Sequence, residues 1–230
     1  MSRSKLSAVL VHGAWADGSS WTKVIIPLRS TGVNAVTAPL PLTTLANDVA
    51  ALDRTLERVD GDVVLVGHAY AGAVIASTHH PKVKALVYIA ALAPAERETV
   101  ADAFYRNAAH PMAPKLAPDA HGSIWLPENA FAAAFAQNAS ADEQAVLAAT
   151  QRPISAACIS VPVGRPLWMD LPSWYLLAEQ DRMIAAETQR FMAERMKAHV
   201  AVRAVDHTPS VSAPGPVVDL ILAAAREVRG

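Results

Sequence analysis

The stretch VVLVGHAYAG, Val63 to Gly72, decides the fold because it leads from an apolar run through a glycine-bounded turn into the start of a helix. The run Val63–Val66 suits a strand buried on both faces, and glycine lets the chain reverse direction tightly. A strand, turn and helix joined in this way present the central residue of the turn at the edge of a sheet. That residue is Ala69, where the pattern G-x-S-x-G has a nucleophilic serine.

Six short apolar runs, rich in valine, isoleucine, leucine and tyrosine, predict buried parallel strands. They are Lys5–His12, Val33–Pro39, Asp62–Gly67, Val83–Ala91, Ser173–Glu179 and Val200–Val205. The segments between them predict helices at Ser19–Ser30, Thr43–Val59, Tyr70–Thr78, Ala185–Lys197 and Pro216–Val228. In the second helix the apolar residues recur every three or four positions, and the charged residues between them are expected on the polar face: Asp48, Asp53, Arg54 and Glu57. This alternation predicts an α/β fold with a doubly wound parallel sheet covered on both faces.

The alternation stops between about residues 94 and 172, a distance much longer than a crossover needs. Helical patches such as ERETVADAFYR and ENAFAAAFAQ alternate there with proline-marked turns. The segment also holds large apolar side chains that it can bury: Phe104, Trp125, Phe131, Phe135 and Trp168. We therefore expect a single domain over residues 1–230, with a helical cap inserted at about 94–172.

Composition narrows the class of partner. Twenty basic and twenty-one acidic side chains leave a net charge near zero, without the basic cluster that nucleic acids or anionic lipids require. The N-terminus reaches a His-Gly turn before a signal-peptide core could form, and the single cysteine, Cys158, excludes an internal disulfide. Cys158 is expected to be a packed small residue. The sequence thus predicts a cytoplasmic protein with a small-molecule partner, no nucleic acid and no membrane span, and it is compatible with a homodimer.

Four segments in a fixed order carry a resemblance to a known family. VHGAW follows the first strand, GHAYAG the third, AEQDR the strand after the insertion, and VDHTP the last strand. The chain resembles an α/β-hydrolase, similar to the branch of small esterases and hydroxynitrile lyases. Each segment comes at the carboxyl end of an expected strand, the edge at which open α/β sheets bind ligands. The resemblance implies an α/β-hydrolase fold, with a mostly parallel doubly wound sheet and a helical cap insertion.

The resemblance assigns a role to each matching position. His207 would be the catalytic base, Asp181 the carboxylate that orients it, and Ala69 stands at the nucleophile position. The backbone N–H groups of Ala14 and Tyr70 would form the oxyanion hole. Two neighbouring carboxylates, Glu179 and Asp206, rank second to Asp181 and are expected at the surface.

Other polar and aromatic residues are expected around this site. His12 and Gly13, which shape the HGAW turn, are expected at the substrate pocket. Trp15, Trp125 and Trp168 are candidates for the wall of that pocket, as are Trp21 and Tyr70. His68 is interpreted as packing rather than as a base. His79 and His80 end a helix, and nothing near them supplies a metal-ligand pattern, so neither a metal nor a cofactor is predicted.

Two positions depart from the family's elbow, which reads G-H-S-Y-G: alanine occupies both the serine position, 69, and the second glycine position, 71. One added methyl at Ala71 should leave the turn intact, but Ala69 has no atom that can attack a carbonyl. Loss of that serine costs such enzymes roughly a millionfold in turnover. Three hypotheses remain: a His-Asp general base acting on a small apolar ester or carbonyl compound, a ligand-binding pseudo-hydrolase, or a serine esterase whose serine was replaced by alanine.

Overall fold

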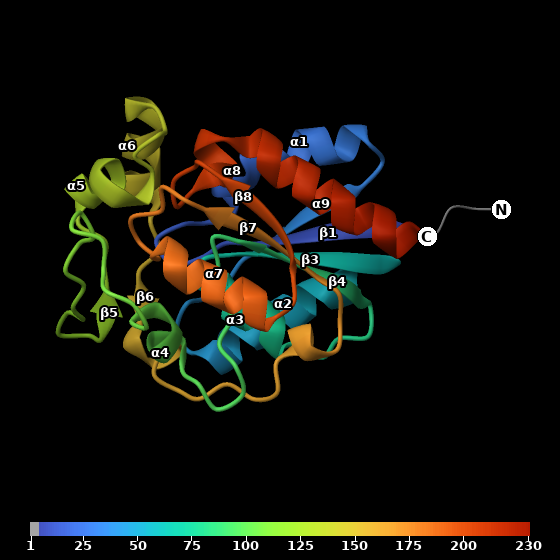
Figure 1. Cartoon of the computed structure of the whole chain (residues 1–230), viewed down its shortest axis with the longest axis horizontal. Helices are drawn as coiled ribbons and strands as arrows, with labels where there is room; N and C mark the ends of the chain where they lie inside the picture. The colour runs from blue at the N-terminus through green and yellow to red at the C-terminus, as the bar shows by residue number, and fades with distance from the viewer. Residues whose placement is uncertain (1–4) are drawn as a thin grey trace.

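The computed structural model describes residues 5–230 and contains a six-stranded parallel sheet (Figure 1). In space the strands are ordered β2-β1-β3-β4-β7-β8. Their bounds are β1 Leu6–Val11, β2 Asn34–Ala38, β3 Asp62–His68, β4 Val83–Ile89, β7 Ser173–Ala178 and β8 His199–Arg203. All six predicted strands are confirmed, with ends that differ by at most two residues.

Helices cover both faces of the sheet, as a doubly wound fold requires (Figure 1). α1 (Thr22–Ser30) and α9 (Pro214–Arg229) lie together on one face, and α2 (Leu45–Arg58), α3 (Ala71–Ser77) and α7 (Ala186–Arg195) lie on the other. A short 3-10 helix, η1 (Gly18–Trp21), precedes α1, so the α-helix there begins three residues later than predicted. A single turn, α8 (Pro209–Ser212), lies before α9.

The long segment between β4 and β7, residues 90–172, has secondary structure of its own, and we refer to it below as the insertion. Its elements are α4 Val100–Phe104, β5 Ser123–Ile124, α5 Glu128–Ala130, the π-helical turn η2 Phe131–Phe135, α6 Ala141–Thr150, β6 Ile154–Ser155, η3 Ala156–Cys158 and η4 Leu167–Met169. β5 and β6 pair in an antiparallel fashion. α6 and the β5–β6 pair were not predicted from the sequence.

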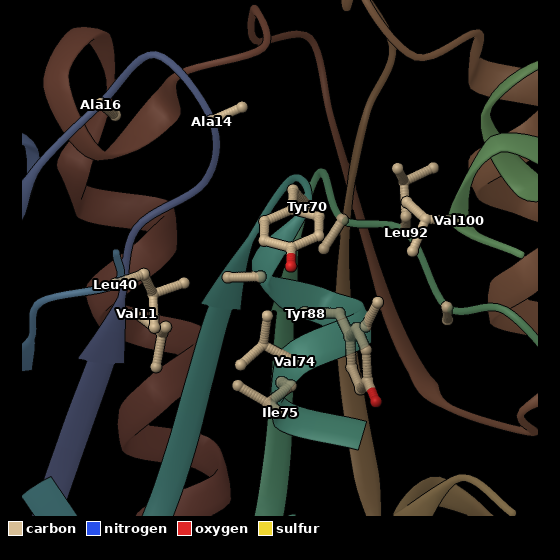
Figure 2. Close-up of a cluster of buried hydrophobic side chains, with 14 of the residues drawn as sticks. Val11, Ala14, Ala16, Leu40, Tyr70, Val74, Ile75, Tyr88, Leu92 and Val100 are labelled. Carbon is tan, nitrogen blue, oxygen red and sulfur yellow. The ribbon is translucent and has the colours of Figure 1, made fainter. Parts of the chain in front are cut away.

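Two apolar cores fill the space on the two sides of the sheet. One contains α1 and α9 side chains such as Val24 and Ile221. The other contains α2 and α3 together with insertion residues such as Phe131 and Phe135, so the insertion is packed onto the same core as the sheet. Figure 2 shows part of this second core, with Tyr70 and Leu92 close to one another.

One charged residue lies inside that core. Asp48 was expected on the polar face of α2, but its side chain is fully buried. It lies on the same face of the helix as Leu45 and Leu52, three residues after the first and four before the second. The prediction for Asp48 was therefore wrong. It was assigned to the polar face because it is charged, but its position in the helical repeat places it on the apolar face.

Candidate active site

The turn between β3 and α3 holds Ala69 in a left-handed backbone conformation, with a φ of 50°. Non-glycine residues adopt this region at a cost of roughly 1–2 kcal/mol. Three main-chain hydrogen bonds hold the turn: the Ala69 N–H donates to Ile89 O at 3.2 Å, and its carbonyl accepts from Gly72 N–H at 3.1 Å and Leu92 N–H at 2.9 Å. The turn is therefore formed, and strained, without a serine.

Two glycines permit the close approaches that the turn needs. A Cβ at Gly13 would lie 2.9 Å from both the Ala69 Cβ and the His68 carbonyl oxygen. A Cβ at Gly72 would overlap the carbonyl oxygen of Leu92. Ala71, at the second glycine position of the family pattern, is fully buried and begins α3, so its methyl group is accommodated.

His207 and Asp181 meet behind this turn. The Nδ1 atom of His207 lies 2.8 Å from Oδ2 of Asp181, and both side chains are buried. Asp181 Oδ1 also accepts hydrogen bonds from the N–H groups of Met183 (2.7 Å) and Ile184 (2.9 Å). Because the other contacts of the carboxylate are all donors, we assign the ring proton to Nδ1, which donates a hydrogen bond to Asp181. This tautomer has a lone pair on Nε2.

Gln189, on α7, supports the carboxylate and was not recognised from the sequence. Its Nε2 donates to Asp181 Oδ2 at 2.8 Å and to the Ile184 carbonyl at 2.9 Å, and its Oε1 accepts from the Ala178 N–H at 3.0 Å. The side chain is fully buried. A buried amide inside a helix eight residues after a strand-end aspartate is the signal that sequence inspection could have used.

The loop that carries His207 is fixed by its neighbours. His68 Nε2 donates to the His207 carbonyl oxygen at 2.7 Å, and the ring of Phe135 lies 5.2 Å from the His207 ring. Burial lowers the pKa of His68 to about 3, with the charge of His207 as a smaller cause. His68 is therefore neutral at physiological pH and acts as a donor within the loop, in line with its interpretation as a packing residue.

Ala14 and Tyr70, whose main-chain N–H groups were expected to form the oxyanion hole, both line the same cavity. The N–H groups of Ala14 and Tyr70 make none of the turn and loop hydrogen bonds within residues 5–230. Trp15, which has a φ of 57°, fixes the first of them by donating its N–H to Arg152 O and its Nε1 to Ile124 O, each at 2.9 Å. Two carbonyl groups of the insertion thus hold the HGAW turn in place through Trp15.

A cavity of about 60 Å³ lies between the sheet edge and the insertion. From the sheet side it is lined by Ala14, Trp15, Ala69, Tyr70, Met183, Ile184 and His207. From the insertion it is lined by Leu92, Val100, Ala101, Phe104, Tyr105, Leu116, Ile124, Ile154 and Ile159. Among the described residues, no lysine, arginine, aspartate or glutamate lines it, and His207 is the one basic group that does.

The structure places several expected pocket residues elsewhere. His12 is buried behind the turn, where Nδ1 is 2.9 Å from the Gly13 carbonyl and Nε2 accepts from Leu40 N–H, so neither His12 nor Gly13 lines the cavity. Trp125, which directly follows β5, is half exposed, whereas the residue before it, Ile124, lines the cavity. The other two tryptophans expected at the pocket are buried in other contacts: Trp168 beside Arg195, and Trp21 against His68.

Of the second-ranked carboxylates, Glu179 is exposed as expected, but Asp206 is fully buried, so its surface assignment was wrong. Asp206 accepts hydrogen bonds from Asn138 N–H at 2.9 Å, Thr208 N–H at 3.2 Å and Ser212 Oγ at 2.6 Å. It therefore ties the His207 loop to the insertion, while Asp181 contacts the ring.

Other kinds of site find no support in the described part of the chain. Within residues 5–230, no three histidine, cysteine, aspartate or glutamate side chains gather as metal ligands would. None of the helices in that range combines the length and apolarity needed to cross a bilayer. Cys158 is buried, and burial raises the pKa of its thiol to about 12, so it stays protonated.

Comparisons with known proteins extend over nearly the whole chain. The model described as the alpha/beta hydrolase family matches residues 8–220. A curated protein of Phoma sp., described as a probable hydrolase, is 25% identical over 237 residues, which cover 93% of this chain and 95% of the relative.

Two solved structures share the fold at low sequence identity. Polyneuridine aldehyde esterase has a TM-score of 0.82 at 19% identity and covers 96% of this chain and 99% of its own. A variant of tomato methylketone synthase I, complexed with β-ketoheptanoate, has a TM-score of 0.81 at 18% identity, with 97% and 98% covered.

Proposed function

Because the chain belongs to the alpha/beta hydrolase family, we propose that it carries out general-base chemistry on a small, neutral ester or carbonyl compound without an acyl-enzyme intermediate. The observation that supports this most directly is the 2.8 Å contact between His207 and Asp181 beside a position that has no nucleophile. The contact gives His207 a carboxylate partner that would orient it as a base, and His207 lines an apolar cavity. General-base catalysis needs these groups and does not need a serine.

The chemistry assigns one role to each group. His207 Nε2 takes a proton from water, from a hydroxyl or from a carbon next to a carbonyl, and Asp181 stabilises the resulting imidazolium. The N–H groups of Ala14 and Tyr70 hold the negative oxygen that forms. With an ester, water attacks the carbonyl carbon as it gives its proton to His207, and collapse of the intermediate expels the alkoxide, which recovers that proton. With a ketone, His207 Nε2 removes a proton from the carbon next to the carbonyl, which leaves an enolate; return of the proton regenerates the ketone.

No other side chain at the cavity is suited to replace the serine. The lining residues include no serine, threonine, cysteine or lysine among those described, and the two hydroxyls present belong to Tyr70 and Tyr105. Burial raises the pKa of Tyr70 far above its usual range, so its hydroxyl is not an anionic nucleophile. This favours transfer of a proton over formation of a covalent intermediate.

The cavity favours a neutral substrate. A carboxylate bound there would lose its water without gaining a cationic partner, which is strongly unfavourable. A matched pair of probes tests this: β-ketoheptanoate, the acid named with the methylketone synthase structure, and its methyl ester. We expect the ester to be bound and processed in preference to the acid. Equal processing of the two would contradict the neutral-substrate assignment.

The base mechanism is tested by proton exchange. The methyl ester and a panel of simple esters and ketones are incubated with the protein in D₂O, and NMR follows deuterium entering the carbon next to the carbonyl, as well as any hydrolysis. We expect His207→Ala to reduce both signals to the rate measured without protein, since it removes the base. Activity that survives in His207→Ala would refute the mechanism. His79→Ala, at an exposed histidine, is the matched control and should leave activity unchanged.

Restoring the hydroxyl tests the geometry. In Ala69→Ser the new Oγ should come within hydrogen-bond reach of His207, roughly 2.6–3.2 Å, and cleave a short p-nitrophenyl ester. An organophosphonate should label the same hydroxyl, because labelling needs both an activated oxygen and the oxyanion hole. We expect only partial ester-cleaving activity, because the parent chain has no hydroxyl at position 69 that must be aligned with His207. A folded variant that shows neither ester cleavage nor labelling would contradict the roles of His207 as the base and Asp181 as its orienting carboxylate.

A second candidate, a ligand-binding protein without turnover, is favoured by one observation, the methyl group of Ala69 at the nucleophile position. A thermal-shift screen separates the two. A ligand present at a hundred times its dissociation constant stabilises a protein by about 2.7 kcal/mol. A stabilising ligand returned unchanged favours binding alone, and conversion of every stabilising ligand eliminates this candidate.

A further inference from the structure

A buried cluster under the β3–α3 turn joins three parts of the chain. Asp48 on α2 accepts a hydrogen bond from the Tyr70 hydroxyl at 2.7 Å and another from the Leu42 N–H at 2.7 Å. The thiol of Cys158, in the insertion, lies 3.7 Å from the same carboxylate oxygen that binds Tyr70. Asp48 therefore contacts the turn, the loop before α2 and the insertion at once.

The cluster reaches the site through Tyr70. This residue lines the cavity, and its N–H is one of the two expected oxyanion donors, so one residue carries both the donor and the anchored hydroxyl (Figure 2). The peptide that presents this N–H follows Ala69, whose φ of 50° is strained. Strained backbone persists only where its surroundings over-determine it. The hydroxyl of Tyr70 fastened to Asp48 is a side-chain restraint on a turn that is otherwise held by main-chain hydrogen bonds.

The insertion is tied to the same point. The Leu42 carbonyl accepts from the Ser155 N–H at 2.9 Å, and Leu42 itself has a φ of 57°. Ser155 precedes the short helix η3 that ends at Cys158, and the next residue, Ile159, lines the cavity. Asp48 thus contacts both ends of the segment from Ser155 to Cys158, through Leu42 at one end and directly at the other, and this segment leads into the cavity wall at Ile159.

We propose that Asp48 is a positioning residue that holds the Tyr70 N–H in place for oxyanion binding by fastening the Tyr70 hydroxyl. A buried carboxylate is kept at this place because three donors converge on it. The charge serves the geometry of the turn and not proton transfer, because Asp48 does not line the cavity. This inference rests on the proposed function, since it concerns the oxyanion donor of that site.

The test uses variants that separate positioning from folding. Tyr70→Phe deletes only the hydroxyl and keeps the ring and the N–H. Tyr88→Phe is the matched control, because Tyr88 is fully buried, its hydroxyl has no partner within residues 5–230, and it does not line the cavity. Asp48→Asn retains an oxygen acceptor of the same size, whereas Asp48→Leu removes it. Each is made in the parent chain and in Ala69→Ser.

Two readouts are taken. For cleavage of a p-nitrophenyl ester in the Ala69→Ser background, we expect Tyr70→Phe and Asp48→Leu to lower kcat about tenfold with little change in KM, since a lost transition-state contact acts on kcat. Asp48→Asn should recover most of that loss, and Tyr88→Phe should have no effect. In the parent chain, amide hydrogen exchange of the turn peptide, residues 67–74, should accelerate in Tyr70→Phe and not in Tyr88→Phe.

The outcomes separate the two claims. If Ala69→Ser cleaves the ester and Tyr70→Phe leaves kcat unchanged, the positioning role of Asp48 is overturned and the proposed function stands. Unchanged hydrogen exchange of the turn in Tyr70→Phe overturns the anchor whatever the ester assay shows. If Ala69→Ser is folded and inactive in every background, the proposed function fails and this inference falls with it.

Discussion

Gln189→Leu should destabilise the protein severely although it preserves side-chain volume. Gln189 is fully buried on α7 and makes three hydrogen bonds, to Asp181, to the Ile184 carbonyl and from the Ala178 N–H. Leucine fills the same space, so no large cavity opens. The loss instead comes from the polar groups that remain without partners.

The expected magnitude follows from counting those groups. Asp181 keeps its other donors, but the Ile184 carbonyl and the Ala178 N–H lose the partner that Gln189 supplied. Each stranded buried group costs about 1–3 kcal/mol. We therefore expect the free energy of unfolding to fall by about 3 kcal/mol, the lower part of the summed range, because leucine adds apolar burial. For a protein of this size that corresponds to a decrease in Tm of roughly 6–12 °C.

Equilibrium urea denaturation, followed by tryptophan fluorescence and circular dichroism, measures the difference. The matched control is Gln180→Leu, the same change at an exposed position one residue before Asp181, which removes one exposed hydrogen bond from Asn138 Nδ2 and should cost less than about 1 kcal/mol. A loss below about 1 kcal/mol for Gln189→Leu would refute the reasoning, because the stranded groups would then have found other partners.

Three further predictions concern pH and packing. Burial lowers the folded-state pKa of His68 to about 3, so the unfolded chain binds a proton that the folded chain does not, and stability should fall as pH drops from about 6.5. His68→Gln keeps a donor for the His207 carbonyl and should flatten this part of the urea-derived stability profile between pH 6.5 and 4.5; an unchanged slope would contradict the assignment. For Glu98, burial raises the pKa, but hydrogen bonds from Arg195 and a backbone N–H outweigh it and leave the pKa below its usual range. Its contribution is present above its unfolded pKa and is lost as pH falls through the folded value, so Glu98→Gln should destabilise at pH 7 and converge with the parent in acid, and a constant difference would argue against it. Gly72→Ala should cost at least about 3 kcal/mol or prevent folding, since the added methyl overlaps a main-chain carbonyl oxygen; a soluble variant with parental Tm would show that the turn relaxes.

The sheet could be predicted from the sequence because its strands are buried on both faces. A strand such as β3 must then be apolar at every position, and runs of that kind stand out against polar loops. The parallel, doubly wound arrangement followed from the alternation of strands with helices, whose crossovers leave few topologies open. The insertion was less predictable, because its elements are short and lack a long repeat. The β5–β6 pair, for example, has only two residues in each strand, too few to show an alternating pattern.

The candidate site divides in the same way. Main-chain positions such as Ala14 and Tyr70 could be named because they follow strand ends, which the apolar runs locate. Side-chain directions could not be named, because they depend on contacts between distant segments. Trp125 and Ile124 are neighbours in the sequence, yet only Ile124 lines the cavity, and Trp125 is half exposed. Asp206 is buried by a contact with Asn138, almost seventy residues earlier, for which no local pattern exists.

The conformation of Ala69 bears on which hypothesis for the site is stronger. An alanine at a φ of 50° keeps a cost of roughly 1–2 kcal/mol that relaxed backbone would avoid. Its side chain contributes no hydroxyl, so the strained turn no longer serves to present a nucleophile. In the proposed site the turn would still present the Tyr70 N–H; Gly13 and Gly72 permit the close approaches at the turn, and the Tyr70 hydroxyl is hydrogen-bonded to Asp48. Retention of that strain in the absence of serine favours a site in which the main-chain donor does the chemical work, with His207 as its base. A site that only bound apolar ligands would need the cavity and would not need the strained turn.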